Sequence, residues 1–285
     1  MNAPAELMPR EGVIHSLSIE AYHGDKTAVS KSGLDDMARS PFHYWSRHLD
    51  PQRPPEEPRT SASEMAGTLL HAALLEPDEF DKRYAVGPDV ARSTKVWKEF
   101  EEGARAQGKA AIKPEQYTAA KRQADACRAL PEVRDALSKG HAEVSAYWRD
   151  PETGVLCRCR PDWVTPVGES QAIILDAKTY SNASPDEFRR QIARMAYHRQ
   201  DAWYWDGYQH ASGHEVVAFL FVAVELEWPY AASTVMLDDA AREQGRRENR
   251  RLLDTYARCL RDNQWPAFPG GPHPVSLPAW AIDKE

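Results

Sequence analysis

Three charged residues near the middle of the chain have the types and spacing that metal-ion chemistry needs. Asp162 follows a proline in "RPD", and Asp176 and Lys178 stand two apart at the end of the apolar run "IILDAKT". Side chains two apart on a β-strand point to the same face. Neighbouring carboxylates repel each other, and a divalent cation such as Mg²⁺ or Mn²⁺ removes that repulsion. A lysine beside such an ion can orient a water molecule and stabilise an anionic transition state.

Each candidate residue has an ordinary structural explanation when it is taken alone. Asp162 could cap a turn, and Asp176 and Lys178 could form an ion pair at a strand end. A lone histidine such as His71 is more often a packed or surface residue than a ligand. The prediction of a site therefore depends on convergence, which requires Asp162 to end one strand and the Asp-x-Lys pair to end its neighbour.

The elements that must position these residues predict an α/β fold. Segments 143–149 and 155–164 alternate apolar and polar residues around the turn "DPETG", which predicts an antiparallel hairpin. The later elements are predicted to be a strand, a long helix and two more strands, over 172–179, 185–211, 215–226 and 231–237. Because a helix between two strands is a crossover, we expect a mixed central sheet of about five strands flanked by helices.

Further helices are predicted from capping residues and from three-to-four spacing. The first begins near Ser32 as its N-cap. The second, over about 64–76, places His71 on a polar stripe of an otherwise apolar helix. Two others are expected over 114–129 and 238–262, of which the last is rich in arginine.

The overall composition limits the classes of protein to which the chain can belong. Its 285 residues are 42% hydrophobic, which is enough for a large globular core. The net charge of −7 gives no global attraction for a polyanion, so any nucleic-acid surface must be local. The sequence contains no membrane-length apolar run and no signal-peptide pattern, so we expect a cytoplasmic protein without membrane contact. It also contains no glycine-rich phosphate loop, so no dependence on ATP is expected.

The order of the charged residues matches a known nuclease motif. "RPD" at 160–162, a spacer of 13 residues and "DAK" at 176–178 form the PD-(D/E)xK pattern. Further segments match in order: "SKSGLDDMARSPFHYW", "GTLLHAALLEPDEF", "HAEVSAYWRDPETGVLCRCRPDWV", "QDAWYWDGY" and "WPAFPGGPHPVSLPAW". Over about residues 28–282 the sequence therefore resembles the nuclease domain of RecE-type exonucleases (exodeoxyribonuclease VIII). The resemblance implies an N-terminal extension over 1–27 and a single exonuclease domain with a Pro-rich tail over 28–285.

The resemblance also assigns roles to individual residues. It implies a metal site built from a histidine, two acids and a backbone carbonyl, with a catalytic lysine beside them: His71, Asp162, Asp176, Ala177 and Lys178. A Gln-x-x-x-Tyr pair of related nucleases matches Gln200 and Tyr204, which stand four apart and so share a helix face. Glu143, at the start of the first predicted strand, is a further candidate acid.

For such an enzyme the resemblance implies Mg²⁺-dependent degradation of linear double-stranded DNA from 5′ to 3′, with Mn²⁺ as a substitute. The 3′ single-stranded tails would serve annealing-type recombination. Expected partners are DNA ends, a single-strand annealing protein and further copies of the chain in a homo-oligomeric ring, a tetramer in preference to a trimer. A ring needs positive charge only along its DNA channel, so a negative net charge of the whole chain is compatible with DNA binding. The candidate channel residues, each of which could equally belong to a solvated face, are Arg158, Arg160, Arg189, Arg190, Arg194 and Arg199.

Two other functions remain open at this point. Another PD-(D/E)xK DNA nuclease, of the Cas4-like or repair-endonuclease type, would share the site, and its iron–sulfur members need four grouped cysteines. The four cysteines here lie at 127, 157, 159 and 259 without a C-x-x-C pair, so we expect reduced thiols and no iron–sulfur cluster. A non-catalytic DNA-binding module of the same fold is the other alternative, and it should bind no Mg²⁺ through Asp162 and Asp176.

Overall fold

The computed structural model describes residues 11–54, 61–268 and 270–278. Its centre is a five-stranded sheet in the order β10-β9-β8-β7-β4. The strands are β4 (His141–Ala142), β7 (Trp163–Val167), β8 (Gln171–Tyr180), β9 (Glu215–Glu225) and β10 (Ala232–Val235). β8 and β9 pair in parallel across their helical connection, and the other neighbours pair antiparallel. The predicted mixed sheet of about five strands, flanked by helices, is confirmed.

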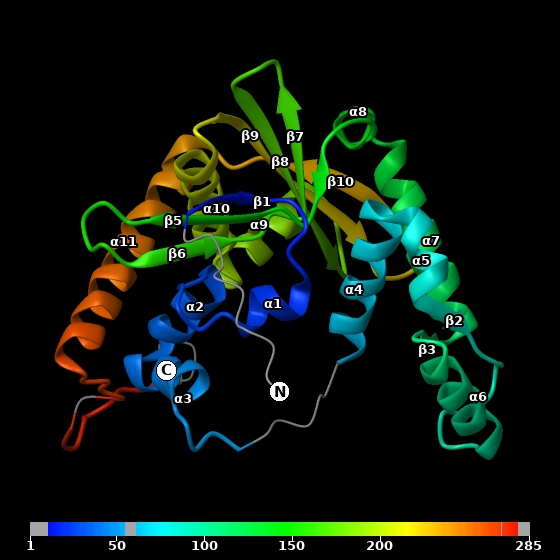
Figure 1. Cartoon of the computed structure of the whole chain (residues 1–285), viewed down its shortest axis with the longest axis horizontal. Coiled ribbons are helices and arrows are strands. Elements are labelled where there is room, and N and C mark those ends of the chain that lie inside the picture. Colours follow the sequence, from blue (N-terminus) through cyan, green and yellow to red (C-terminus); the bar gives the residue numbers. More distant parts are fainter. Residues whose placement is uncertain (1–10, 55–60, 269, 279–285) are drawn as a thin grey trace, which may run out of the picture.

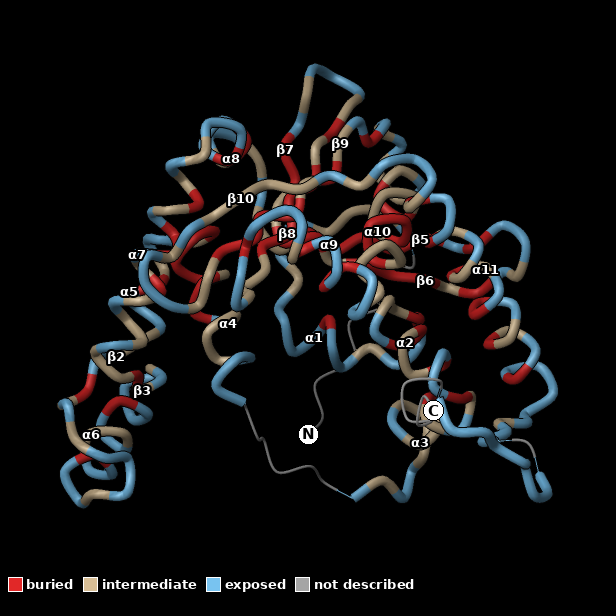
Figure 2. The backbone as a smooth tube through the Cα atoms, turned by 180° about the vertical axis from the view of Figure 1, so that it is seen from behind, coloured by how far each residue is buried: buried red, intermediate tan, exposed pale blue. Residues whose placement is uncertain are grey.

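Helices cover both faces of this sheet (Figure 1). One face packs against α4 (Ala62–Leu75), α7 (Pro114–Ala129) and α8 (Pro131–Leu137). The other is covered by α9 (Pro185–Arg194) and α10 (Tyr197–Ser212). Beyond them, α2 (Lys31–Arg39) and α11 (Asp239–Asp262) pack against α10, and α3 (Pro41–His48) packs against α2 and α11. Buried residues are concentrated in the central strands and in α10, between these two layers (Figure 2).

Strand β8 carries the Asp-x-Lys pair and is the third of the five strands, so helices cover both of its faces. Leu175 and Ala177 belong to the apolar cluster under α4 and α7, whereas Ile174 belongs to the cluster under α10 and α11. This alternation is what a side-chain period of two requires. A strand buried on both sides gives the charged residues at its end a rigid support.

Two smaller sheets complete the described structure. β1 (Gly12–Ile14), β5 (Ser145–Arg149) and β6 (Leu156–Cys159) form an antiparallel sheet in the order β1-β5-β6. β2 (Tyr84–Val86) and β3 (Ala110–Ile112) pair in parallel on either side of α6 (Lys95–Ala106). The remaining helices are α1 (Ile19–Gly24) and α5 (Pro77–Arg83). In the ranges that the structure describes, no helix has both the length and the apolar character needed to cross a bilayer.

The predicted hairpin of 143–149 and 155–164 is only partly right. β5 and β6 do pair antiparallel, but the return strand ends at Cys159, and β7 begins at Trp163 in a different sheet. Pro161 lies in the gap, and proline has no N–H to donate to a strand ladder. Asp162 therefore lies just before a strand rather than at the end of one.

Two helix predictions are also corrected, although those over 64–76, 114–129 and 238–262 are confirmed as α4, α7 and α11. The N-cap of α2 is Ser30, whose hydroxyl accepts the Gly33 N–H, and not Ser32. The segment 185–211 forms two helices, α9 and α10, because Ala196 adopts the left-handed conformation (φ 51°) between them. Alanine is uncommon in that conformation, so the residue type at this position does not predict the break.

Candidate active site

The site is built where the pairing between β7 and β8 ends. The last paired residues are Trp163 and Leu175, so the backbone of Ala177 has no strand partner on that side. Its N–H instead donates a hydrogen bond of 2.8 Å to Asp162 Oδ2, and its carbonyl oxygen lies 2.9 Å from His71 Nε2. The same Nε2 atom lies 3.3 Å from Asp162 Oδ2. A helix, a loop and a strand thus bring three predicted ligands to one point.

Asp176 lies on the opposite side of β8, toward α10. Its carboxylate is fully buried, with Oδ1 paired to the Lys178 ammonium and Oδ2 accepting a hydrogen bond from the Gln200 amide. Asp176 and Lys178 therefore share a face, as their spacing predicts. Gln200 binds the second acid directly. Tyr204, one turn further along α10, packs against Phe219 with ring centroids 6.3 Å apart.

The ionisable groups of the site perturb one another strongly. Burial raises the pKa of Asp162 to about 7; the His71 charge lowers it, whereas Asp176 raises it further. Burial alone would lower the pKa of His71, but the Asp162 carboxylate and the Ala177 carbonyl raise it above its usual value. Burial likewise opposes the charge of Lys178, yet Asp176 and Asp162 raise its pKa. The carboxylates thus favour a positive charge at this site.

The donor set fits a divalent cation. Among the described residues, His71, Glu143 and Asp162 offer ligand atoms that all lie within 4.8 Å of one another. Glu143 is held in a left-handed conformation (φ 53°), its N–H donates to the Asp162 carbonyl at 2.9 Å, and its carboxylate accepts a 2.7 Å hydrogen bond from Arg160 Nε. Such strained residues often occur at functional sites. One nitrogen among several oxygen ligands suits Mg²⁺ or Mn²⁺.

The predicted channel arginines differ in their environments. Arg189 and Arg190 are exposed on α9, and Arg194 donates to the Gln191 side chain. Arg199 is 13% exposed and pairs with Asp35 at 2.8 Å. The Arg160 guanidinium forms an ion pair with the Glu143 carboxylate. Arg158 is buried, and its guanidinium donates a hydrogen bond to the Tyr22 carbonyl. Both of these arginines are therefore engaged in contacts within the protein.

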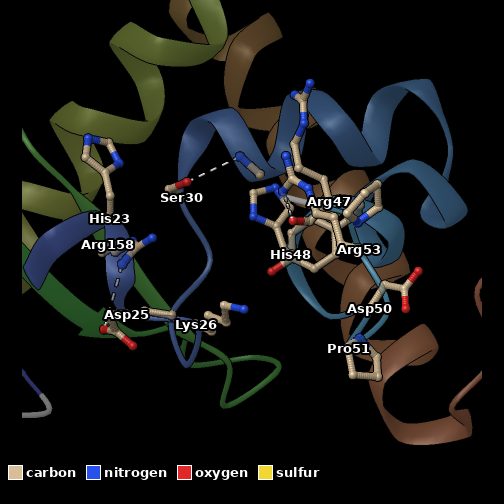
Figure 3. A pocket seen from close by; sticks show the side chains of 14 residues that line it. His23, Asp25, Lys26, Ser30, Arg47, His48, Asp50, Pro51, Arg53 and Arg158 are labelled. Carbon is tan, nitrogen blue, oxygen red and sulfur yellow. Dashed lines mark hydrogen bonds and ion pairs between the residues drawn. The ribbon is translucent and has the colours of Figure 1, made fainter. Parts of the chain in front are cut away.

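The structure also contains a cavity lined by basic residues, which the sequence analysis did not predict. A cavity of about 710 Å³ opens between the loop after α1 and helix α3 (Figure 3). The basic residues that line it are His23, Lys26, Arg47, His48, Arg53 and Arg158, with Asp25 and Asp50 as its acids. Arg158 enters it from β6, and its buried Nε has no hydrogen-bond partner within the described ranges. No motif groups these residues, because they come from three separate segments, around residues 23–26, 47–53 and 158.

A family model described as a PDDEXK-like domain of unknown function (DUF3799) matches residues 30–272. Among solved structures, a "Putative exonuclease" from Eubacterium rectale superposes with a TM-score of 0.58 at 14% identity, covering 92% of this chain and 96% of that one. An alkaline exonuclease from Laribacter hongkongensis gives a TM-score of 0.26 at 14% identity, over 68% and 96% of the two chains. A search of curated protein sequences gives no match. The first superposition supports the shared fold, and the second adds no argument.

Proposed function

This chain belongs to the family of PDDEXK-like domains, and we propose that it is a metal-dependent exodeoxyribonuclease that degrades linear double-stranded DNA from 5′ to 3′. The observation that carries the proposal is the position of His71 Nε2, which lies 2.9 Å from the Ala177 carbonyl oxygen and 3.3 Å from Asp162 Oδ2. Asp176 and Lys178 complete the set on the same strand. The PD-(D/E)xK part of the predicted resemblance holds for the chain, and the RecE-type assignment is our proposal.

We assign the metal ligands to His71, Asp162, Asp176 and the Ala177 carbonyl, with Glu143 as a further candidate, because its carboxylate lies within 4.8 Å of the ligand atoms of His71 and Asp162. A bound Mg²⁺ would act as a Lewis acid and lower the pKa of a water molecule. The electrostatics of the site support a bound cation, because burial beside Asp176 holds the pKa of Asp162 at about 7. A cation would allow both carboxylates to ionise.

The other residues have roles that do not depend on where the ion lies. The Lys178 ammonium orients the attacking water and offsets negative charge on the oxygens around phosphorus in the transition state. Gln200 fixes the orientation of Asp176 through its hydrogen bond to Oδ2. Tyr204 supports the helix face that carries Gln200, because it packs into the core four residues further on.

The basic cavity supports an anionic strand as the substrate. Lys26, Arg47 and Arg158 line it, and their positive charges would attract a phosphate group. The exposed Arg189 and Arg190 add positive charge on α9. We propose that these groups contact the DNA backbone, which would make binding strongly salt-dependent.

We further propose that the protein acts as a homo-oligomeric ring, a tetramer rather than a trimer, together with a single-strand annealing protein. The acidic average charge supports an assembly in which basic groups face an inner channel. Light scattering of the purified protein tests the ring, and a monomeric mass would reject it. Co-purification with a candidate annealing protein tests the second partner separately.

The activity can be tested by measuring acid-soluble nucleotide released from linear and from covalently closed duplex DNA, in Mg²⁺ and in EDTA. We expect release from linear DNA only, in Mg²⁺ only, and none from Asp176→Ala. Glu99→Ala, which removes an exposed acid on α6, is the matched control and should be fully active. Duplexes labelled at the 5′ or 3′ end give the polarity.

Cleavage of closed circles would replace the exonuclease proposal by an endonuclease of the same superfamily. A protein that releases no nucleotide and binds Mg²⁺ equally well with and without Asp162 would instead be a non-catalytic module.

A further inference from the structure

Tyr197 lies beside the catalytic lysine, although no sequence motif points to it. It is the first residue of α10, and the centroid of its ring lies 5.1 Å from Lys178 Nζ. An ammonium at this distance from an aromatic face is attracted by the quadrupole of the ring. Lys178 therefore has two partners, the Asp176 carboxylate and the Tyr197 ring.

The position of the Tyr197 ring is fixed by the protein core. The ring stacks on Phe221 with centroids 5.7 Å apart, and its centroid lies 6.2 Å from that of Phe188. Both phenylalanines are fully buried. The left-handed turn at Ala196 breaks the long helix immediately before Tyr197 and so sets its direction. The Tyr197 ring is therefore held in a fixed position, and the more flexible Lys178 side chain packs against it.

We infer that Tyr197 is a positioning residue for Lys178. A lysine side chain has many rotamers, and a single carboxylate partner fixes its charge without fixing its direction. That carboxylate, Asp176, is also a proposed metal ligand, so its attraction for the lysine is shared with the ion. The ring is not a proposed metal ligand. The Tyr197 ring would therefore keep the Lys178 ammonium in place when Asp176 also binds the metal ion.

A second lysine provides an internal comparison. Lys31 Nζ lies 6.0 Å from the centroid of the same Tyr197 ring, but Asp35 pairs with it at 2.8 Å. Asp35 is not a proposed metal ligand. Loss of the ring should therefore release Lys178 more than Lys31.

The kinetic part of this inference rests on the proposed nuclease function, so the first test is independent of activity. Reductive methylation of the protein in Mg²⁺ without DNA, read by mass spectrometry, reports how readily the reagent reaches each amine in its deprotonated form. Tyr197→Leu should raise the methylation rate of Lys178 on the order of tenfold, with a smaller change at Lys31. Tyr197→Phe keeps the ring and should behave as wild type. Tyr208→Leu, which removes another buried ring of α10, controls for general loosening.

The second test is kinetic. Tyr197→Leu should lower kcat on the order of tenfold with KM unchanged, because Lys178 acts in the transition state, and Tyr197→Phe should restore most of the rate. Equal Lys178 methylation in Tyr197→Leu and Tyr208→Leu would overturn the inference, as would a raised KM with unchanged kcat. If the wild-type protein cleaves no DNA, the proposed function fails while the methylation test still decides the role of Tyr197.

Discussion

Asp162→Asn should make the metal-free protein more stable at alkaline pH, although it should abolish cleavage. The wild-type carboxyl is 8% exposed, and burial raises its pKa from 3.8 to about 7. A folded state that holds a proton more tightly than the unfolded state loses stability as pH rises between these two values. The difference corresponds to at most about 4 kcal/mol above pH 7. An asparagine avoids this cost, and its amide oxygen can still accept the Ala177 N–H.

The neighbouring histidine reduces the gain and sharpens its pH dependence. The positive charge of His71 partly stabilises the Asp162 carboxylate, and the pKa of about 7 already includes this effect, so the gain at pH 8 should not exceed about 4 kcal/mol. At pH 5 the wild-type protein benefits from a protonated His71, whose pKa is raised by Asp162. The advantage of the variant should therefore shrink to zero as pH falls from 8 to 5.

The assay is urea denaturation in EDTA at several pH values between 5 and 8. Asp150→Asn is the matched control: burial opposes the charge of Asp150, but Arg250 and Thr153 lower its pKa, so this variant should be less stable at pH 8. Adding Mg²⁺ should stabilise the wild type and not Asp162→Asn. An Asp162→Asn protein that is less stable than wild type at pH 8, or equally shifted at every pH, would refute the electrostatic reasoning.

Three further substitutions test the supporting structure. Gln200→Leu leaves a buried oxygen of Asp176 without its donor, and it should cost about 1–3 kcal/mol of stability in urea and lower kcat; an unchanged kcat would exclude Gln200 from the site. Ala196→Gly relieves a left-handed alanine and should raise the free energy of unfolding by about 1 kcal/mol, with cleavage retained. Gly207→Ala drives a methyl group into the Trp148 ring and should cost about 1–3 kcal/mol; a neutral result in thermal unfolding would show that this contact can relax.

The parts of the site that follow a short-range rule could be predicted from the sequence. The shared face of Asp176 and Lys178 follows from the strand period, and the apolar run before them predicts a buried strand. The parallel pairing of β8 with β9 follows from the helical crossover. The break at Ala196 could not be predicted, because its left-handed backbone is stabilised by packing that local propensity does not register. The basic cavity was missed for a similar reason, since only the tertiary fold brings its segments together.

The position of Asp162 shows how a wrong prediction of local structure can still place a residue correctly. Pro161 interrupts the ladder, so β6 and β7 enter different sheets and Asp162 lies in the gap. The same interruption ends the β7–β8 pairing at Leu175, which leaves the N–H and carbonyl of Ala177 unpaired on that side. Buried backbone groups need partners. The Asp162 carboxylate accepts the Ala177 N–H, and His71 Nε2 lies at the Ala177 carbonyl oxygen. The residues that contact these unpaired backbone groups are therefore those that we propose to bind the metal.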